Sequence, residues 1–273
     1  MHPKHLLDRY QIEPKKSLGQ NFLFDEGLLG RIVAAAELSP EDEVLEVGPG
    51  LGALTRPLAA AARRVVAVEL DGRLLPVLES ELNGLSNVEL VQGDVLELAP
   101  ADWFAAPYVV VANVPYYITG AILRHLLGSQ PRPRRLVLTV QREVADRLTA
   151  KPPDMSLLAV SVQYYGRVRL VSAVRAGAFW PRPEVDSAVV RIDVEERHLW
   201  GAGAGQNALP EAAFFRVVRA GFSEKRKQLK NNLRQLGLDD VAIAAALERA
   251  GIDGRRRAET LSVAEWERLA ALL

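Results

Sequence analysis

The stretch VLEVGPGLGALT, residues 44 to 55, joins a short apolar run to a turn with glycine at positions 48, 50 and 52. The apolar run suits a buried strand, and the residues after the turn suit a helix. Glycines in such a turn let a ligand approach the backbone, and the first turn of the helix offers free N–H groups. The stretch therefore predicts a strand, a ligand-binding turn and a helix, with the acidic Glu46 two residues before the first glycine.

The segments around this stretch repeat the alternation of strand and helix up to about residue 195. Short β-branched runs alternate with longer amphipathic stretches, an order typical of βαβ units with a parallel sheet. Because VRLVSAV (168–174) and DSAVVRIDV (186–194) have no obvious helix between them, we expect an antiparallel pair at the sheet edge. The predicted fold is α/β, with a Rossmann-like and mostly parallel sheet. Its strand-like runs are VLEV (44–47), VVAVEL (65–70), VELVQ (88–92), YVVVAN (108–113) and RLVLTV (135–140).

The pattern becomes wholly helical from Phe214 onward. Ser223 is a candidate N-cap for a helix that stops at Gly237, and Asp239 for a second helix that ends near Gly251. Ser262-Val-Ala-Glu265 is a capping box that opens a third helix. The GAGAG run at 201–205 reads as a flexible linker. We therefore expect one domain over residues 1–200 and a small helical domain over 206–273.

Composition excludes several kinds of chemistry. The 273 residues include no cysteine, so disulfides, thiolate zinc sites and cysteine nucleophiles are excluded, and four scattered histidines make no metal-ligand spacing. We expect no metal. No apolar run is long enough to span a membrane, and the N-terminus lacks the apolar stretch of a signal peptide, so a cytoplasmic protein is expected. Thirty-four basic and thirty-four acidic residues cancel, so only the distribution of charge can indicate a nucleic-acid partner.

Carboxylates follow two further strands of the predicted sheet: Glu69 ends the second and Asp94 follows the third. A carboxylate like Glu69 can accept both ribose hydroxyls of a nucleoside cofactor, and Asp94 could accept from an adenine amino group. The G-x-G-x-G spacing departs from the G-x-G-x-x-G fingerprint for pyrophosphate and favours S-adenosylmethionine, which has no phosphate. Taken singly, the glycines suit a tight turn and the carboxylates suit solvated strand ends. Together they favour a cofactor site, because ligands of open α/β sheets gather at the carboxyl ends of the strands.

The fourth strand ends in Asn113-Val114-Pro115-Tyr116, which would lie at the same edge. An aromatic amine such as adenine N6 is a poor nucleophile, because its lone pair is delocalised into the ring. Acceptors on its two hydrogens, here the Asn113 side-chain oxygen and the Val114 carbonyl, would favour a pyramidal nitrogen aimed at a methyl group. Pro115 would fix the direction of that carbonyl, and Tyr116 would offer a ring for the base to stack on. The alternative is a polar turn with an anchoring tyrosine; we expect Tyr117 to serve packing.

These motifs, read together, resemble those of the KsgA-type (RsmA) rRNA adenine dimethyltransferases over nearly the whole chain. Besides EVGPGLGALT and NVPYY, the sequence carries KKSLGQNFL (15–23), FWPRPEVDSAVVRI (179–192) and FFRVVRAGFSEKRKQLKNNL (214–233). The resemblance implies S-adenosylmethionine-dependent dimethylation of two adjacent adenosines in a hairpin near the 3′ end of 16S rRNA, during assembly of the small ribosomal subunit. It implies that Phe179 faces the target base opposite Tyr116, although an aromatic before Trp180-Pro181 also suits core packing. The implied cofactor contacts are Gln20, Asn21, Leu23, Gly48, Gly50, Glu69, Asp94 and Asn113. Gln20 and Asn21 also suit a helix cap.

Basic residues concentrate in residues 215–234, where seven stand against the single acidic Glu224. Such a concentration in a neutral protein is the electrostatic footprint of a phosphate backbone, although a charged helix face can also be merely solvated. Two further clusters, Arg132 with Arg134 and Arg135, and Arg255 to Arg257, are candidates to extend it. The predicted RNA-binding residues are Arg216, Arg219, Lys225, Arg226, Lys227, Lys230 and Arg234.

Three other functions stay open. An Erm-type methyltransferase of large-subunit rRNA shares QNF, the glycine loop and an N-x-P-Y element, but AGFSEKRKQLKNNL favours the KsgA type. A non-catalytic assembly or transcription factor on the same fold is a second alternative, and DNA adenine methylation a third. We expect a monomer that acts on 16S rRNA within an immature small subunit, with no membrane partner.

Overall fold

The structure, a computed structural model, describes residues 2–199 and 209–273. Its contacts divide the chain into two compact units. The predicted linker at 201–205 lies outside the described residues. The first unit comprises Met1–Ala145 and Arg167–Gly201, and the second comprises Asp146–Gly166 and Ala202–Leu273.

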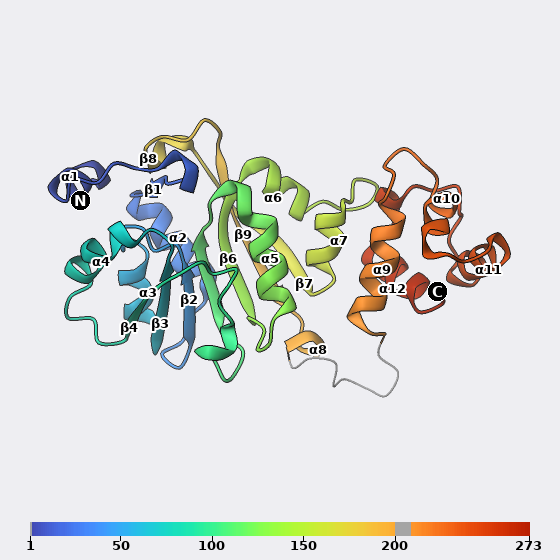
Figure 1. The fold of residues 1–273 in the computed structure, drawn as a ribbon, viewed down its shortest axis with the longest axis horizontal. Helices are drawn as coiled ribbons and strands as arrows, with labels where there is room; N and C mark the ends of the chain where they lie inside the picture. The colour runs from blue at the N-terminus through green and yellow to red at the C-terminus, as the bar shows by residue number, and fades with distance from the viewer. Residues whose placement is uncertain (1, 200–208) are drawn as a thin grey trace. The chain divides into compact units, whose positions relative to one another are not determined.

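A seven-stranded sheet runs through the first unit (Figure 1). Its strands are β2 (Glu43–Val47), β3 (Arg64–Glu69), β4 (Val88–Gln92), β5 (Val109–Asn113), β6 (Arg135–Gln141), β7 (Gly166–Val174) and β9 (Ser187–Val194). The strand order is β4-β3-β2-β5-β6-β9-β7. The first five strands of this order pair in parallel, and β9 runs antiparallel to β6. The predicted mostly parallel sheet with an antiparallel edge is confirmed.

Helices cover both faces of this sheet. Successive residues of a strand point to opposite faces, yet Val109 to Ala112 of β5 are all buried, so neither face meets water there. On one face, Leu28 and Ile32 pack into a single apolar cluster with residues of β5 and β6. No helix among the described residues is both long and apolar enough to cross a membrane. The α-helices are α1 (Pro3–Arg9), α2 (Glu26–Ala36), α3 (Thr55–Ala61), α4 (Leu75–Glu81), α5 (Thr119–Gly128), α6 (Arg142–Leu148) and α8 (Glu196–Leu199); the 3₁₀ turns are η1 (Lys16–Leu18), η2 (Gly72–Leu74), η3 (Pro100–Asp102), η4 (Tyr116–Ile118) and η5 (Ala176–Ala178).

A second, two-stranded sheet ties the N-terminal segment to a distant part of the chain. Strand β1 (Phe22–Leu23) pairs antiparallel with β8 (Phe179–Trp180). Leu23 lies opposite Phe179, and both side chains are buried in the apolar cluster beneath α2. This pairing places the QNFL stretch beside the main sheet.

The second unit is helical. It contains α7 (Leu157–Gln163), α9 (Glu211–Gly221), α10 (Leu229–Leu233), η6 (Arg234–Leu236), α11 (Asp240–Ala250), η7 (Ala258–Thr260) and α12 (Val263–Ala270). Asp239 caps α11 by accepting from the Ala242 N–H, and the helix ends at Gly251. Ser262 and Glu265 form the expected capping box on α12.

The division into units differs from the predicted one at residues 146–166. The sequence placed this segment in a domain over residues 1–200, whereas its contacts place it with the C-terminal helices. The ring of Tyr164 stacks on that of Phe214 with centroids 4.1 Å apart. The backbone N–H of Met155 donates to the Glu259 carbonyl. These contacts join residues far apart in sequence, so local pattern gives no sign of them.

The predicted helix cap at Ser223 is wrong. Residues 222–228 form turns, and α10 begins only at Leu229. The buried Asn232 amide holds these turns by donating to the carbonyls of Gly221 and Glu224, at 2.6 and 3.0 Å. The N–H of Leu229 donates to the Arg256 carbonyl, so backbone from a later loop takes the place of a side-chain cap.

Candidate functional site

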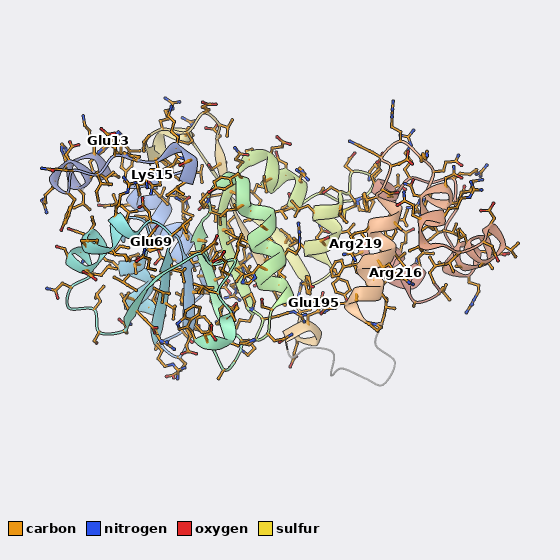
Figure 2. All side chains as sticks on the ribbon, viewed as in Figure 1. Glu13, Lys15, Glu69, Glu195, Arg216 and Arg219 are labelled. Carbon is orange, nitrogen blue, oxygen red and sulfur yellow. The ribbon has the colours of Figure 1, made fainter. Side chains whose placement is uncertain are left out.

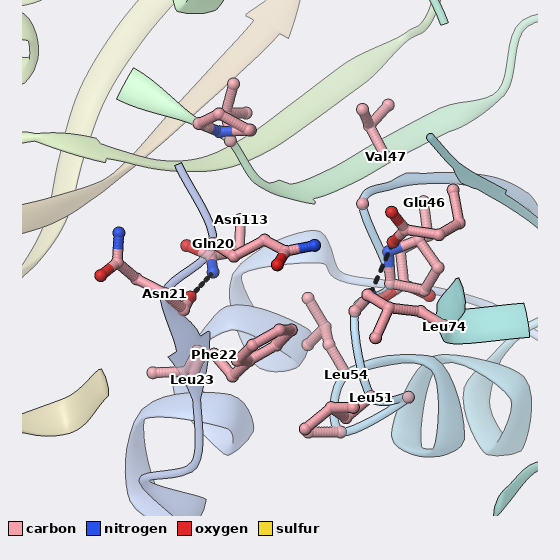
Figure 3. Close-up of a pocket in the computed structure, with 18 of the residues that line it drawn as sticks. Gln20, Asn21, Phe22, Leu23, Glu46, Val47, Leu51, Leu54, Leu74 and Asn113 are labelled. Atoms are coloured by element: carbon pink, nitrogen blue, oxygen red, sulfur yellow. Dashed lines mark hydrogen bonds between the residues drawn. The ribbon is translucent and has the colours of Figure 1, made fainter. Parts of the chain in front are cut away.

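A cavity of about 400 Å³ lies where β2, β3 and β5 end in the first unit. Its size suits a small-molecule ligand. The glycine loop, Glu69, Asp94 and Asn113 line it, together with the segment from Gln20 to Leu23 (Figure 3). The structure therefore brings together all eight predicted cofactor residues, from segments that lie between positions 20 and 113 of the sequence.

The glycine loop takes a conformation that favours glycine. Gly48, Gly50 and Gly52 have φ values of +70°, +59° and +78°. At Gly50 an added Cβ would also lie 3.0 Å from the ring of Phe22, so the N-terminal segment packs directly against this turn. The loop thus has a fixed path and a backbone open to the cavity.

Glu69 is oriented by the backbone around it. One carboxylate oxygen accepts from the Gly50 N–H at 3.2 Å, and the other accepts from the Asp71 N–H at 2.9 Å. Each oxygen keeps a second lone pair, so the carboxylate can still accept from a ligand hydroxyl. Burial raises the pKa of the Glu69 carboxyl above its ordinary value, and the two backbone hydrogen bonds oppose that rise.

Asp94 and Gln20 both line the cavity, but they differ in how many of their polar atoms are already hydrogen-bonded. One Asp94 oxygen accepts from the Leu96 N–H at 2.9 Å, which leaves the other oxygen for a ligand. The Gln20 amide donates to Asp71 at 2.8 Å and accepts from the Lys15 N–H at 2.7 Å. Gln20 therefore serves first to fix the N-terminal segment against the turn after β3.

Asn113, the last residue of β5, contacts the same segment. Its side-chain nitrogen donates to the Asn21 carbonyl at 3.0 Å (Figure 3). The amide oxygen then points away from Asn21, and no hydrogen bond to this oxygen is found within the described residues. Val114 is buried and lines the cavity, and Pro115 follows with φ −55°. The amide oxygen and the Val114 carbonyl are thus available as acceptors.

The three aromatic candidates lie in different surroundings. The side chain of Tyr116 is outside the described residues. Tyr117, for which packing was predicted, borders the cavity and is 63% exposed, so it is not part of the buried core. Phe179 is 3% exposed, packs in the cluster with Leu23 and does not line the cavity. The structure therefore supports the core-packing alternative for Phe179, because the β1–β8 pairing turns its ring into the apolar cluster.

Glu46 is a site residue to which the sequence assigned no role. It lines the cavity, is 1% exposed, and its Oε2 has no hydrogen-bond partner within the described residues. Burial raises the pKa of the Glu46 carboxyl to about 8, and the nearby Glu69 charge acts in the same direction. Its position before the glycines was visible in the sequence, but its burial was not.

The predicted RNA-binding residues all lie in the second unit and are all exposed. Arg216 and Arg219 project from α9 (Figure 2), and Lys225 and Arg226 lie in the turns after it. Lys227 pairs with Glu224 at 2.6 Å, and Arg234 pairs with Asp240 through two contacts of 2.7 Å. Within the described residues, no ion pair is found for Arg216, Arg219, Lys225, Arg226 and Lys230.

The two clusters suggested to extend this basic surface have other partners. The buried Arg132 donates to the carbonyls of Leu127 and His198, and Arg135 binds Asp193 and the Ala36 carbonyl. These arginines fix the first unit internally. Arg134 pairs with Asp42, Arg255 with Asp253, Arg256 with Glu265, and Arg257 with Glu259.

The cavity fits S-adenosylmethionine on chemical grounds. Glu69 offers acceptors for ribose hydroxyls, Asp94 offers a free carboxylate oxygen, and Glu46 Oε2, which has no partner among the described residues, adds a polar atom beside the glycine loop. The described residues hold no group of three or more His, Asp or Glu side chains arranged for a metal ion.

Comparison with known proteins agrees with this site. The family model for ribosomal RNA adenine dimethylase matches residues 12–273. The chain is 45% identical to "Ribosomal RNA small subunit methyltransferase A" of Dehalococcoides mccartyi, with 97% of this chain and 90% of the relative covered, and 45% identical to the protein of the same name from Moorella thermoacetica, with 95% and 92% covered.

Two solved structures share the fold over most of the chain. The 23S rRNA methyltransferase ErmE is 31% identical, with a TM-score of 0.74 over 93% of this chain and 99% of that one. A dimethyladenosine transferase from Plasmodium falciparum is 25% identical, with a TM-score of 0.78 over 91% and 95%. The match of the family model over nearly the whole chain, with the motifs gathered around one cavity, means that this chain belongs to the ribosomal RNA adenine dimethylase family.

Proposed function

We propose that the protein uses S-adenosylmethionine to dimethylate two adjacent adenosines in a hairpin near the 3′ end of 16S rRNA, within an immature small ribosomal subunit. The observation that carries this proposal is the Asn113 amide, whose nitrogen is bound to the Asn21 carbonyl and whose oxygen is available at the cavity. The names of the relatives at 45% identity support the small subunit as the substrate.

The chain's own residues position the amine and exchange no proton with it. Asn113 and the Val114 carbonyl would accept the two N6 hydrogens of adenine and so aim its lone pair. S-Adenosylmethionine, when bound, supplies a methyl group already activated by its sulfonium charge. The amine can release its proton after attack, so no histidine or lysine base is needed. We expect Glu69 to hold the ribose, Asp94 the adenine of the cofactor, and the ring of Tyr116 the target base.

The second unit would bind the RNA backbone through its basic residues, five of which have no ion-pair partner among the described residues. We expect residues 206–273 to act as an RNA-binding domain together with 146–166, and the protein to act as a cytoplasmic monomer. Of the alternatives, an Erm-type enzyme has a solved relative at 31% identity, below the 45% of the small-subunit enzymes.

One experiment tests the proposal against its rivals. The protein is incubated with methyl-labelled S-adenosylmethionine and unmethylated small subunits, with large subunits and DNA in parallel, and the labelled nucleosides are identified after digestion. We expect N6,N6-dimethyladenosine at two adjacent positions of 16S rRNA only. Label in large-subunit rRNA or in DNA would transfer the activity to that substrate. Cofactor binding by calorimetry with no label anywhere would indicate a non-catalytic factor.

A further inference from the structure

Tyr117 combines features that the proposed mechanism leaves unused. The residue is 63% exposed, the largest exposed fraction among the Phe, Trp and Tyr residues that the structure describes, and it borders the cavity. Aromatic side chains usually bury most of their surface, so an exposed ring at the rim of a site is a candidate contact. No ring contact or hydrogen bond of its side chain is found within the described residues.

The backbone around Tyr117 gives its ring a defined place. The residue lies in the single turn η4, where the Ile118 N–H donates to the Pro115 carbonyl at 3.2 Å. An added Cβ on Gly19 would lie 3.5 Å from the Tyr117 ring and 3.2 Å from Pro115 Cβ. Gly19 has φ +63°, a conformation that favours glycine, and the absence of a Cβ there leaves room for the edge of the ring. One side of the ring is therefore supported, and the rest faces solvent.

The position of Tyr117 relative to Asn113 decides what the ring can meet. Asn113 and Val114 take the target amine, which requires the target base to leave its stack and enter the cavity. Tyr117 follows four residues after Asn113, at the rim, where a nucleotide next to the extruded one remains outside. That nucleotide has lost a stacking neighbour, and an exposed aromatic ring can replace it.

We propose that Tyr117 positions the RNA by stacking on the nucleobase directly adjacent to the target adenosine. The inference rests on the proposed function for the identity of the RNA. The ring holds the flanking nucleotide while the target base is out of the stack, and so raises the fraction of bound RNA in the productive conformation. Tyr117 is a positioning residue, because it touches neither the reacting nitrogen nor the methyl group.

The test is a double-mutant cycle between protein and RNA. The full-length protein and its Tyr117→Ala and Tyr117→Phe variants are titrated with the target hairpin, and with hairpins that carry an abasic site one nucleotide 5′ or one nucleotide 3′ of the target. Leu170→Ala, which changes an exposed apolar residue of β7 in the first unit that does not line the cavity, is the control. Cofactor affinity is measured by calorimetry for every variant, and turnover of the unmodified RNA is measured separately.

We expect Tyr117→Ala to weaken hairpin binding by about tenfold, with Tyr117→Phe close to wild type and cofactor affinity unchanged. For the wild type, one of the two abasic hairpins should bind about tenfold more weakly than the intact hairpin. For Tyr117→Ala, the same abasic hairpin should bind as tightly as the intact hairpin. The proposal would be overturned if, at both abasic positions, the loss of affinity from Tyr117→Ala and the loss from the abasic site multiplied independently. Equal losses of affinity for the alanine and phenylalanine variants would also overturn it. If the wild type does not methylate the RNA but the coupling between Tyr117 and the flanking base is still measured, the proposed reaction is wrong and the stacking role is retained.

Discussion

The side-chain amide of Asn113 makes one hydrogen bond, and the direction of this bond decides which group can accept from a substrate. The nitrogen donates to the Asn21 carbonyl, so only the oxygen is left for the substrate. We expect Asn113→Ala to lower single-turnover methylation of unmethylated small subunits by about 100-fold or more, with RNA binding retained. Cofactor affinity should fall only modestly.

The Asn113→Asp variant separates position from acceptor capacity. It keeps an oxygen acceptor but places a second oxygen against the Asn21 carbonyl, where a donor is required. We expect a loss close to that of Asn113→Ala. Near-normal rates for either variant would contradict the positioning mechanism.

Glu69 should matter for cofactor binding more than for RNA binding. Glu69→Ala removes the proposed ribose acceptors and also frees the Gly50 and Asp71 N–H groups, so we expect cofactor affinity to fall by about 1–3 kcal/mol. Glu69→Gln keeps the shape of the side chain and one oxygen acceptor. Its amide nitrogen, however, would lie against the Gly50 or the Asp71 N–H, where an acceptor is required. Calorimetry with S-adenosylmethionine measures both, and unchanged affinity in the alanine variant would exclude Glu69 from the ribose site.

Among the secondary-structure elements, the connection between α9 and α10 differs most from the prediction made from the sequence. The sequence predicts a helix from Ser223, whereas Asn232 holds the turns that follow α9 and the backbone at 254–256 accepts from the first N–H groups of α10. Asp239 and the Ser262–Glu265 box were predicted correctly, because such caps depend on residues three apart. A cap supplied by a distant backbone carbonyl leaves no sequence signal.

The turns present Lys225 and Arg226 outside a regular helix face, beside Lys227 and Lys230. We expect replacement of these four residues by alanine to weaken RNA binding and to reduce the slope of log K against log salt concentration, with cofactor affinity unchanged. Equilibrium binding at several salt concentrations measures the slope.

A matched control for this variant removes two arginines of the first unit that do not line the cavity. Arg63→Ala with Arg169→Ala changes two exposed arginines that pair with Glu43 and Glu37 near the amino ends of the parallel strands. Its salt slope should be compared with that of Lys225→Ala with Arg226→Ala, which removes the same charge. Equal slopes in the two double variants would mean that the basic turns are only a solvated surface.

Burial of the Glu46 carboxyl makes the stability of the folded protein depend on pH. The Glu46 carboxyl titrates near 4.5 when unfolded and at about 8 when folded, because burial disfavours its charged form. Between these values the folded state holds the extra proton, so its contribution to stability is complete below pH 4.5 and is lost as the pH rises through about 8. At roughly 1.4 kcal/mol for each pKa unit, the loss is at most about 5 kcal/mol.

Glu46→Gln should lack this dependence. We expect the stability of the variant relative to wild type to rise steadily between pH 5 and pH 8, as measured by hydrogen exchange of the β2 and β5 amides, which reports on the first unit alone. Glu79→Gln, which changes an exposed residue of α4, is the control. A constant difference over this range would show that Glu46 is already ionised in the folded protein.

The sequence predicted the sheet, the glycine loop and the carboxylates at the strand ends, because each depends on local periodicity and on the rule that ligands gather at the carboxyl ends. It did not predict the Asn113–Asn21 hydrogen bond, the burial of Glu46 or the place of residues 146–166. Each of these depends on segments that meet only through tertiary packing.

The pairing of β1 with β8 has a consequence for synthesis of the chain. Residues 20–23 form one wall of the cavity, yet their strand partners are Phe179 and Trp180. Since a chain is synthesised from its N-terminus, residues 20–23 are made early. They can be fixed in place only after residues 179 and 180 have been made. We expect ribosome-bound nascent chains to acquire cofactor binding abruptly, only after residue 180 has left the exit tunnel. The proposed cofactor site would thus form only once most of the first unit has been synthesised.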